Sequence, residues 1–121
     1  MSANRNTDLV LDRDRIVQVL TNLLSNAIKV SPAGSKILVA EALFDNVLRI
    51  SVSDSGPGIP PEDLELIFDR FYQSRASRAA QGTGLGLAIC KTIVESHKGF
   101  IGAISFQGQG SEFYFDLPIE L

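Results

Sequence analysis

The chain has 121 residues, which is the length of one domain with a core of its own. Hydrophobic residues make up 45% and charged residues 21% of the sequence, as in ordinary soluble globular proteins. The net charge of −3 gives no electrostatic case for nucleic-acid binding. A single cysteine, Cys90, excludes an internal disulfide and fits a buried structural thiol in a reducing compartment. No apolar run is long enough to span a bilayer, so we expect a cytoplasmic domain without direct membrane insertion.

The first half of the chain predicts a strand, a helix and a hairpin. Residues 7–12 resemble a short strand that runs into a helix cap. A helix should follow and end near Ser31, because Pro32 disfavours helical geometry in the residue before it. Residues 36–44 and 46–54 then predict two strands that Asp45 and Asn46 join as a hairpin turn. The helix has apolar residues at spacings of three and four, namely Ile16, Val19, Leu20, Leu23 and Ala27.

The second half predicts a turn-rich stretch, two helices and a final hairpin. A short helix should cover residues 64–72, and the small, polar and basic residues 73–82 predict a mobile loop. The second long helix is expected over 84–97, with His97 as a helix-end residue. Strands at 99–106 and 111–118 complete the chain. In the last strand, alternation points Phe113, Phe115 and Leu117 to one face and Tyr114 and Asp116 to the other.

This order of elements predicts one domain over residues 1–121. Consecutive strands lie in hairpins, so the sheet should be mixed but mainly antiparallel, with the helices packed on one face. The fold class is therefore an α/β (α+β) two-layer sandwich and not a doubly wound sheet.

The first long helix carries a polar stripe beside its apolar face. Two asparagines one turn apart need a reason, because asparagine is a mediocre helix former. A solvated helix face is the commonest explanation of such a stripe. The alternative is the floor of a ligand site, because amide oxygens suit a hard cation such as Mg²⁺ and lysine suits phosphate. The stripe consists of Arg15, Gln18, Asn22, Asn26 and Lys29.

Two glycine-containing stretches follow. In "DSGPGI", Asp54 ends an alternating apolar run, which predicts a half-buried carboxylate at the end of a strand. It could accept a hydrogen bond from the exocyclic amine of a purine, or the stretch could be an ordinary turn. In "QGTGLGLAI", Gly82, Gly84 and Gly86 could bind an anion at a helix N-terminus or form a flexible hinge. Neither stretch has the lysine of a Walker loop, and the second lacks the dinucleotide fingerprint.

In combination the motifs are far more specific. The chain holds, in order, "NLLSNAIK", "DSGPGI", "IFDRFY" and "GTGLGLAI". It closely resembles the catalytic ATP-binding domain of sensor histidine kinases, part of the gyrase, chaperone and mismatch-repair ATPase superfamily with the Bergerat fold. The four blocks resemble the asparagine box, first glycine box, phenylalanine box and second glycine box of that family, and the resemblance covers almost the whole chain.

The resemblance implies a role for each motif. Asn26 would hold the Mg²⁺ that bridges the ATP phosphates, supported by Asn22, and Lys29 would contact phosphate. Asp54 would accept from the adenine amine. Arg70 would help to align the γ-phosphate or the partner domain. The remaining nucleotide-site residues would shape the adenine pocket, anchor the ATP lid at 73–81 or hinge it: Gly56, Gly58, Ile59, Phe68, Phe71, Gly82, Thr83, Gly84, Leu85, Gly86 and Leu87.

The resemblance also implies the reaction. Hydrolysing members of the superfamily have a glutamate one turn before the Mg²⁺ asparagine, where this chain has Asn22, which cannot accept a proton. We therefore expect transfer of the γ-phosphoryl group of ATP to a histidine on a separate helical dimerisation domain of a two-component sensor kinase. A response regulator would be the partner of the parent kinase. The alternatives are a regulatory fragment that binds nucleotide or a partner without transfer, a chaperone- or gyrase-type ATPase, and a purely structural module.

The chain departs from the family pattern at several points. Val30 stands where an aromatic residue is usual, and Gln73 stands where arginine is common. Family domains usually begin with one more helix and strand, so we expect an N-terminally shortened domain whose exposed sheet edge favours self-association. The acceptor histidine domain is also absent, and we expect no autophosphorylation by this chain alone.

Overall fold

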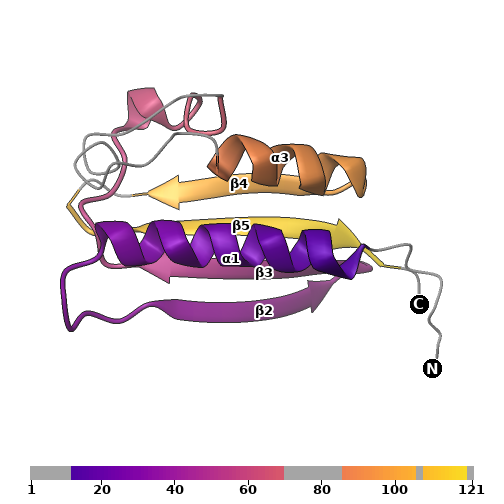
Figure 1. The fold of residues 1–121 in the computed structure, drawn as a ribbon, viewed down its shortest axis with the longest axis horizontal. Coiled ribbons are helices and arrows are strands. Elements are labelled where there is room, and N and C mark those ends of the chain that lie inside the picture. Colours follow the sequence, from indigo (N-terminus) through magenta and orange to yellow (C-terminus); the bar gives the residue numbers. More distant parts are fainter. Residues whose placement is uncertain (1–11, 70–85, 106–107, 120–121) are drawn as a thin grey trace.

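The computed structural model describes residues 12–69, 86–105 and 108–119, which form a four-stranded sheet with two α-helices on one face (Figure 1). This confirms the α+β two-layer sandwich. Neither helix in these ranges is long and apolar enough to cross a membrane. The elements in chain order are α1 (Arg13–Val30), β2 (Leu38–Phe44), β3 (Val47–Asp54), the 3-10 turn η1 (Pro61–Asp63), α3 (Gly86–Ser96), β4 (Phe100–Ser105) and β5 (Ser111–Pro118).

Helix α1 begins and ends where its capping residues predict. The carboxylate of Asp12 accepts a hydrogen bond from the Arg15 N–H at 3.3 Å, which satisfies one free donor of the first turn. The last helical residue is Val30, and Ser31 before the proline is already extended. The expected apolar face is confirmed, since Val19, Leu23 and Ala27 are fully buried.

The sheet has the strand order β2-β3-β5-β4, and each pair of neighbours in it is antiparallel. Strands β2 and β3 are joined by Asp45 and Asn46, whose φ angles of 49° and 61° are those of a tight mirror-image hairpin turn. Asparagine and aspartate tolerate this left-handed conformation better than most residues do, so the predicted turn is confirmed.

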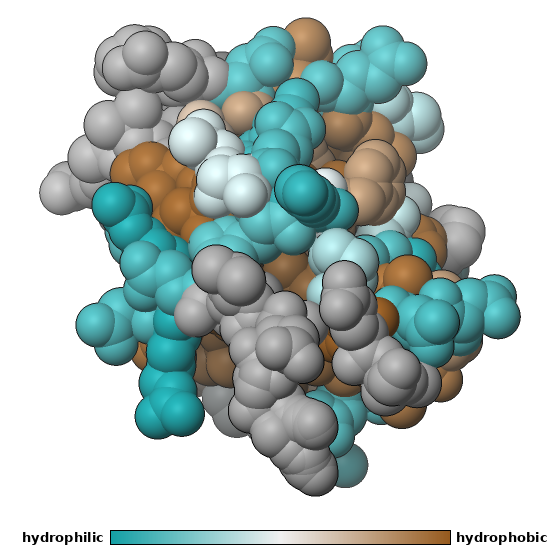
Figure 2. All heavy atoms as spheres, turned by 90° about the vertical axis from the view of Figure 1, so that its right-hand side faces the viewer, coloured by the Kyte–Doolittle hydropathy of each residue, from teal (hydrophilic) through white to brown (hydrophobic). Residues whose placement is uncertain are grey.

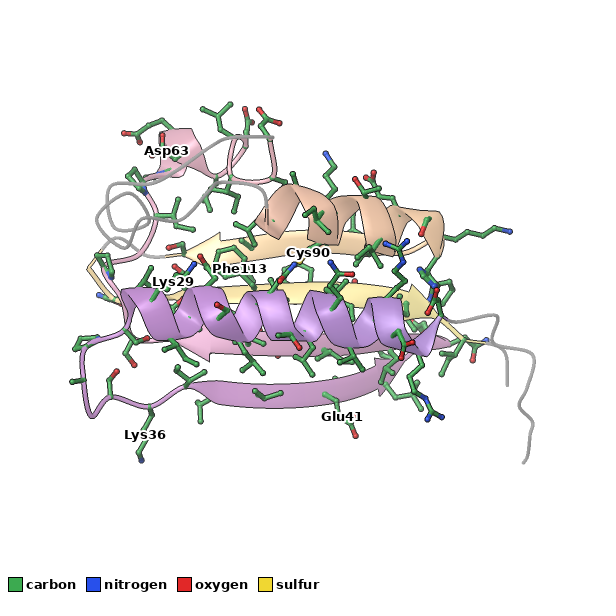
Figure 3. All side chains as sticks on the ribbon, in the orientation of Figure 1. Lys29, Lys36, Glu41, Asp63, Cys90 and Phe113 are labelled. Atoms are coloured by element: carbon green, nitrogen blue, oxygen red, sulfur yellow. The ribbon has the colours of Figure 1, made fainter. Side chains whose placement is uncertain are left out.

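The core lies between the helices and the sheet. Strand β5 alternates as predicted: Phe113, Phe115 and Leu117 are buried under the helices. Figure 3 shows Phe113 and Cys90 in this layer. Burial raises the pKa of the Cys90 thiol to about 11. Its Sγ lies 3.7 Å from the carbonyl of Val19, so Cys90 is the structural thiol that the sequence predicts.

One predicted element is wrong in its described part. The helix expected over 64–72 is replaced, as far as residue 69, by successive turns after η1. The Leu66 N–H donates to Asp63 and the Asp69 N–H to Leu66, which are bonds between residues three apart. This tighter geometry places Ile67 in the core. The strand expected at 7–12 lies outside the described residues, except for Asp12.

Strand β2 is exposed along its whole length. No described helix lies over it in Figure 1, because α1 packs on β3, and α3 packs on β4 and β5. The exposed apolar residues include Leu38, Val39 and Leu43, at 63%, 53% and 58% of full exposure. Within the described residues β2 is an edge strand of the sheet, and the strand predicted at 7–12 lies outside them, so the exposed edge stays a prediction.

Candidate functional site

The described members of the predicted site lie toward the end of the molecule where α1, β3 and β4 end and where β5 and α3 begin (Figure 1). Asp54 is the last residue of β3, an inner strand, and it lies opposite Ser111 in the register with β5. Only 8% of Asp54 is exposed. This carboxylate is therefore more deeply buried than the half-buried side chain that the sequence predicts.

The two oxygens of the Asp54 carboxylate have different surroundings. Oδ1 accepts the Gly56 N–H at 2.8 Å and the Ser111 N–H at 3.2 Å. Oδ2 is buried and has no hydrogen-bond partner among the residues that the structure describes. A buried acceptor without a partner costs free energy, so such an atom in a native protein needs an explanation. A ligand that donates a hydrogen bond at this point is one.

Burial also changes the acidity of this group. Loss of hydration raises the pKa of Asp54, and the hydrogen bonds from Gly56 and Ser111 oppose that rise. Both of these hydrogen bonds are to Oδ1, so Oδ2 takes no part in offsetting the lost hydration.

Two glycines allow the backbone to approach Asp54 closely. A Cβ atom on Gly56 would lie 2.9 Å from both the carbonyl oxygen and Cγ2 of Val30, so any side chain there would push against the end of α1. Gly110 has a φ of +91°, and a Cβ there would collide with the Asp54 carbonyl oxygen. The turn before β5 and the loop after β3 therefore enclose the carboxylate.

The loop that follows α1 is tied to the loop that follows Asp54. The Ser31 hydroxyl accepts the Ser55 N–H at 3.1 Å, and the Ser55 hydroxyl donates to the Lys36 carbonyl at 3.0 Å. Together with the Val30–Gly56 contact, these bonds connect the asparagine-containing helix to the Asp54 loop. Val30, where the family usually has an aromatic residue, thus packs directly on the loop.

The polar stripe of α1 faces the start of α3 at one point. The amide nitrogen of Asn22 donates to the Gly86 carbonyl at 3.4 Å, which joins the first motif to the last. Asn26 lies one turn further on and is half-buried, and Lys29 is exposed in the last turn (Figure 3). Asn22 and Asn26 are therefore not a fully solvated helix face.

The described apolar members of the predicted site belong to the core or its edge. Ile59 is buried, and Phe68 contacts Phe113 edge-to-face with ring centroids 6.4 Å apart. Leu87, in the first turn of α3, packs against the same core. Gly58 has a φ of +79°, which favours glycine. The predicted residues Arg70, Phe71, Gly82, Thr83, Gly84 and Leu85 lie outside the described part of the chain, as do Gln73 and the lid at 73–81.

Sequence reasoning missed Ser111 and Gly110. Neither carries a distinctive motif, and their importance comes from strand pairing between residues 57 positions apart. The one signal in the sequence is the pair Gly110-Ser111 at the start of the last strand. A glycine at this position permits the turn that brings the Ser111 N–H to Asp54.

His97 takes no part in this site. Its Nδ1 donates to the Ile93 carbonyl at 2.8 Å, and its Nε2 accepts the Asp12 N–H at 3.1 Å. It joins the end of α3 to the start of α1 and is the helix-end residue that the sequence predicts. Figure 2 views this opposite end of the molecule, where hydrophilic and hydrophobic side chains are interspersed.

The donor set at the site offers neutral oxygens for a cation. Within residues 12–69, 86–105 and 108–119, no group of three or more His, Cys, Asp or Glu side chains could hold a metal ion. The amide oxygen of Asn26 is a hard ligand of the kind that Mg²⁺ accepts.

Comparisons with known proteins show the family to which this chain belongs. The family described as "Histidine kinase-, DNA gyrase B-, and HSP90-like ATPase" matches residues 11–121. The sensor histidine kinase WalK of Bacillus subtilis (strain 168) is 44% identical over an alignment of 119 residues, and the match covers 95% of this chain and 20% of WalK. The signal transduction histidine-protein kinase BaeS of Escherichia coli (strain K12) is 39% identical over an alignment of 111 residues, and the match covers 90% of this chain and 24% of BaeS.

Solved structures show the same fold. The mycobacterial sensor histidine kinase MprB is similar with a TM-score of 0.84 and 34% identity, over 91% of this chain and 76% of that one. Full-length ShkA in complex with AMPPNP is similar with a TM-score of 0.78 and 37% identity, over 88% of this chain and 22% of that one. This chain thus spans between a fifth and a quarter of WalK and BaeS.

Proposed function

Because this chain belongs to the histidine kinase-, DNA gyrase B- and HSP90-like ATPase family, we propose that it binds Mg-ATP for phosphoryl transfer. The acceptor of the γ-phosphoryl group would be a histidine on a separate helical dimerisation domain. The similarity to WalK and BaeS, both histidine kinases, favours this acceptor within the family.

The observation that carries the proposal is the buried, unpaired Oδ2 of Asp54. The exocyclic amine of adenine is a flat N–H donor, and it would supply the hydrogen bond that Oδ2 lacks. Gly56 lets the loop lie against Val30 and Asp54, because a Cβ there would press on both residues, and this keeps the loop beside the carboxylate. A guanine base has a carbonyl in place of that amine, so the same atom would select adenine.

The phosphates would lie along the polar stripe of α1. Asn26 would hold Mg²⁺, which would neutralise part of the phosphate charge when bound. Lys29, exposed in the last turn of the helix, would reach phosphate as a point charge. Asn22 supports this end by its hydrogen bond to the Gly86 carbonyl, at the start of α3.

The identity of residue 22 also favours phosphoryl transfer over ATP hydrolysis, because it is an asparagine. An amide has no basic lone pair that takes a proton from water near neutral pH, and the Asn22 nitrogen already donates to a backbone carbonyl. In-line transfer to a histidine needs positioning and charge stabilisation more than a base on this chain. We therefore expect slow hydrolysis and fast transfer once an acceptor is supplied.

Other parts of the motif set have roles in the same proposal. Phe68 and Phe71 would anchor the lid, with Phe68 fixed by its ring contact to Phe113. Arg70 would align the γ-phosphate or the acceptor domain. Gly82, Gly84 and Gly86 would hinge the lid and face the phosphates, with Thr83, Leu85 and Leu87 beside them. The parent kinase would pass the phosphoryl group to a response regulator.

The test is phosphoryl transfer in trans. The chain is incubated with γ-labelled ATP, Mg²⁺ and a helical histidine-acceptor domain, and acid-labile label on the acceptor is measured. We expect labelled acceptor, at least ~100-fold less label with Asn26→Ala, and unchanged label with Thr21→Ala, an exposed substitution on the same helix.

Two results would contradict this function. ATP binding without transfer to any supplied acceptor would favour a nucleotide-binding regulatory fragment. Label on His97 in the chain alone would mean that this chain carries its own acceptor, contrary to the structural role of that ring.

A further inference from the structure

The hydroxyl of Ser105 contacts three groups around the loop that follows Asp54. Ser105 is the last residue of β4 and pairs with Ser111 in the sheet. Its Oγ accepts the Ile59 N–H at 2.6 Å, lies 3.2 Å from the Gly110 carbonyl oxygen and lies 2.9 Å from the Ser111 hydroxyl. Ser105 is half-buried and Ser111 is buried.

Hydrogen-bond capacity assigns the direction of these contacts. A hydroxyl has one proton and two lone pairs. A carbonyl can only accept, so the Ser105 proton goes to Gly110. One lone pair takes the Ile59 N–H, and the other takes the proton of Ser111. In this arrangement each contact uses a separate proton or lone pair, and the Ser105 hydroxyl is fully used.

These bonds belong to a larger connection between the β4–β5 hairpin and the Asp54 loop. The Ser111 N–H holds Asp54 Oδ1, and the Gly108 N–H donates to the Pro57 carbonyl. The loop is thus held at Asp54, Pro57 and Ile59. The first two contacts use backbone donors of the hairpin, whereas the third uses the side chain of Ser105 and can be removed by substitution.

We propose that Ser105 is a positioning residue for the adenine end of the nucleotide site. It acts through the Ile59 N–H and through Ser111, which holds the Asp54 carboxylate, and it contacts no reacting atom. The inference rests on the proposed function, because it assigns Asp54 to adenine. Without the hydroxyl, the N–H of buried Ile59 loses its partner, and the loop and the carboxylate are held less firmly.

The position of Ser105 predicts a selective effect on nucleotide affinity. ATP would contact both the adenine end of the site, at Asp54, and the phosphate end, along α1. Inosine triphosphate has the same phosphates but a carbonyl in place of the adenine amine, so it would lack the hydrogen bond to Asp54. A loosened Asp54 loop should weaken ATP and leave inosine triphosphate almost unchanged. A general loss of folded protein would weaken both nucleotides by the same factor.

The experiment compares the Kd of both nucleotides, with Mg²⁺, for the full chain and three variants under conditions where all are folded. The Kd of whichever nucleotide binds more weakly is measured by NMR titration. We expect Ser105→Ala to raise the Kd for ATP about tenfold, the usual effect of losing one buried hydrogen bond, and that for inosine triphosphate less than about twofold. Ser105→Thr, which keeps the hydroxyl, should restore most of the ATP affinity.

Ser96→Ala is the matched control, because the Ser96 hydroxyl donates to the Ile93 carbonyl at 2.6 Å, at the far end of α3. It should leave the ratio of the two affinities unchanged. An unchanged ratio in Ser105→Ala, or an equal change in Ser96→Ala, would overturn the role of Ser105. A wild-type chain that does not bind ATP would overturn the proposed function itself, and the inference with it.

Discussion

At the scale of single residues, the site depends on one carboxylate whose oxygens have separate tasks. Oδ1 of Asp54 accepts hydrogen bonds from the N–H groups of Gly56 and Ser111, and no described residue donates to the buried Oδ2. The buried Oδ2 therefore lowers the free energy of unfolding until a ligand donates a hydrogen bond to it. Function and stability therefore act in opposite directions at this residue.

The raised pKa of Asp54 makes this cost measurable through pH. Because the folded state holds the proton more tightly than the unfolded state, the contribution of Asp54 to stability is fully present below its ordinary pKa of 3.8. It is lost as pH rises through the higher pKa of the folded state. Asp54→Asn has no such titration, so its stability relative to wild type should rise over that window and then level off.

Denaturant unfolding of both proteins across acidic pH, without nucleotide, checks this prediction. The Asn amide oxygen can still accept from Gly56 and Ser111, so the variant should fold. A stability difference that is constant with pH, or one that changes in the opposite direction, would show that burial does not raise this pKa.

Sequence reasoning found Asp54 and Asn22 but not the two serines that surround the site. Asp54 is visible because it ends an alternating strand and begins a turn motif. Ser105 and Ser111 matter only because β4 and β5 pair with the register Ser105↔Ser111, beside the end of β3. That register is a property of the assembled sheet, and no local pattern in the sequence carries it.

At the scale of elements, the sequence predicted the helix ends and strands that depend on neighbouring residues, such as a proline or an alternating apolar pattern. The strand over Ser111–Pro118 and the end of α1 before Pro32 agree with the sequence. The helix predicted over residues 64–72 does not form in its described part. The apolar residues Ile67 and Phe68 are compatible with an α-helix or with 3-10 turns, and the tighter turns are the ones that bury Ile67 in the core.

The open face of the sheet carries a structural ion pair between β3 and β5. The Arg49 guanidinium donates to both Asp116 oxygens at 2.7 and 2.9 Å, and it stacks over Tyr114 with 4.1 Å to the ring centroid. Asp54 and Asp116 both lie on the β3–β5 pair but on opposite faces. The ion pair should therefore contribute to stability and not to nucleotide binding.

Arg49→Ala should lower the free energy of unfolding by about 1 kcal/mol, because the side chains are partly exposed and solvent screens part of the attraction. Arg49→Lys keeps the charge but loses the two-pronged geometry, so it should recover less than half of that loss. Unfolding curves and ATP titrations of both variants test this. A large loss of ATP affinity in either one would show that the two sheet faces are coupled.

At the scale of the whole molecule, the helices cover three strands and leave β2 exposed. In the part of the chain that the structure describes, β2 pairs with β3 alone, and its apolar side chains are exposed on both faces of the sheet. Such an edge favours strand pairing between chains. We therefore expect this chain to associate with itself at high concentration through β2.

Sedimentation velocity over a range of concentrations measures this association. Leu43→Lys, on the exposed edge strand, should weaken it, because lysine is a residue that protects natural sheet edges. Leu66→Lys is the control, since Leu66 is 45% exposed but lies in the turns after η1. Association that is absent at every concentration, or equally weakened by both changes, would contradict a role for β2.

The most direct test of the account is calorimetry of ATP binding, with and without Mg²⁺, by the wild-type chain and Asp54→Asn. We expect wild type to bind ATP and Asp54→Asn to stay folded without measurable binding, because an amide nitrogen at the Oδ2 position would face the adenine amine donor to donor. ATP binding of equal affinity by both proteins would contradict the assignment of the buried Oδ2 to adenine.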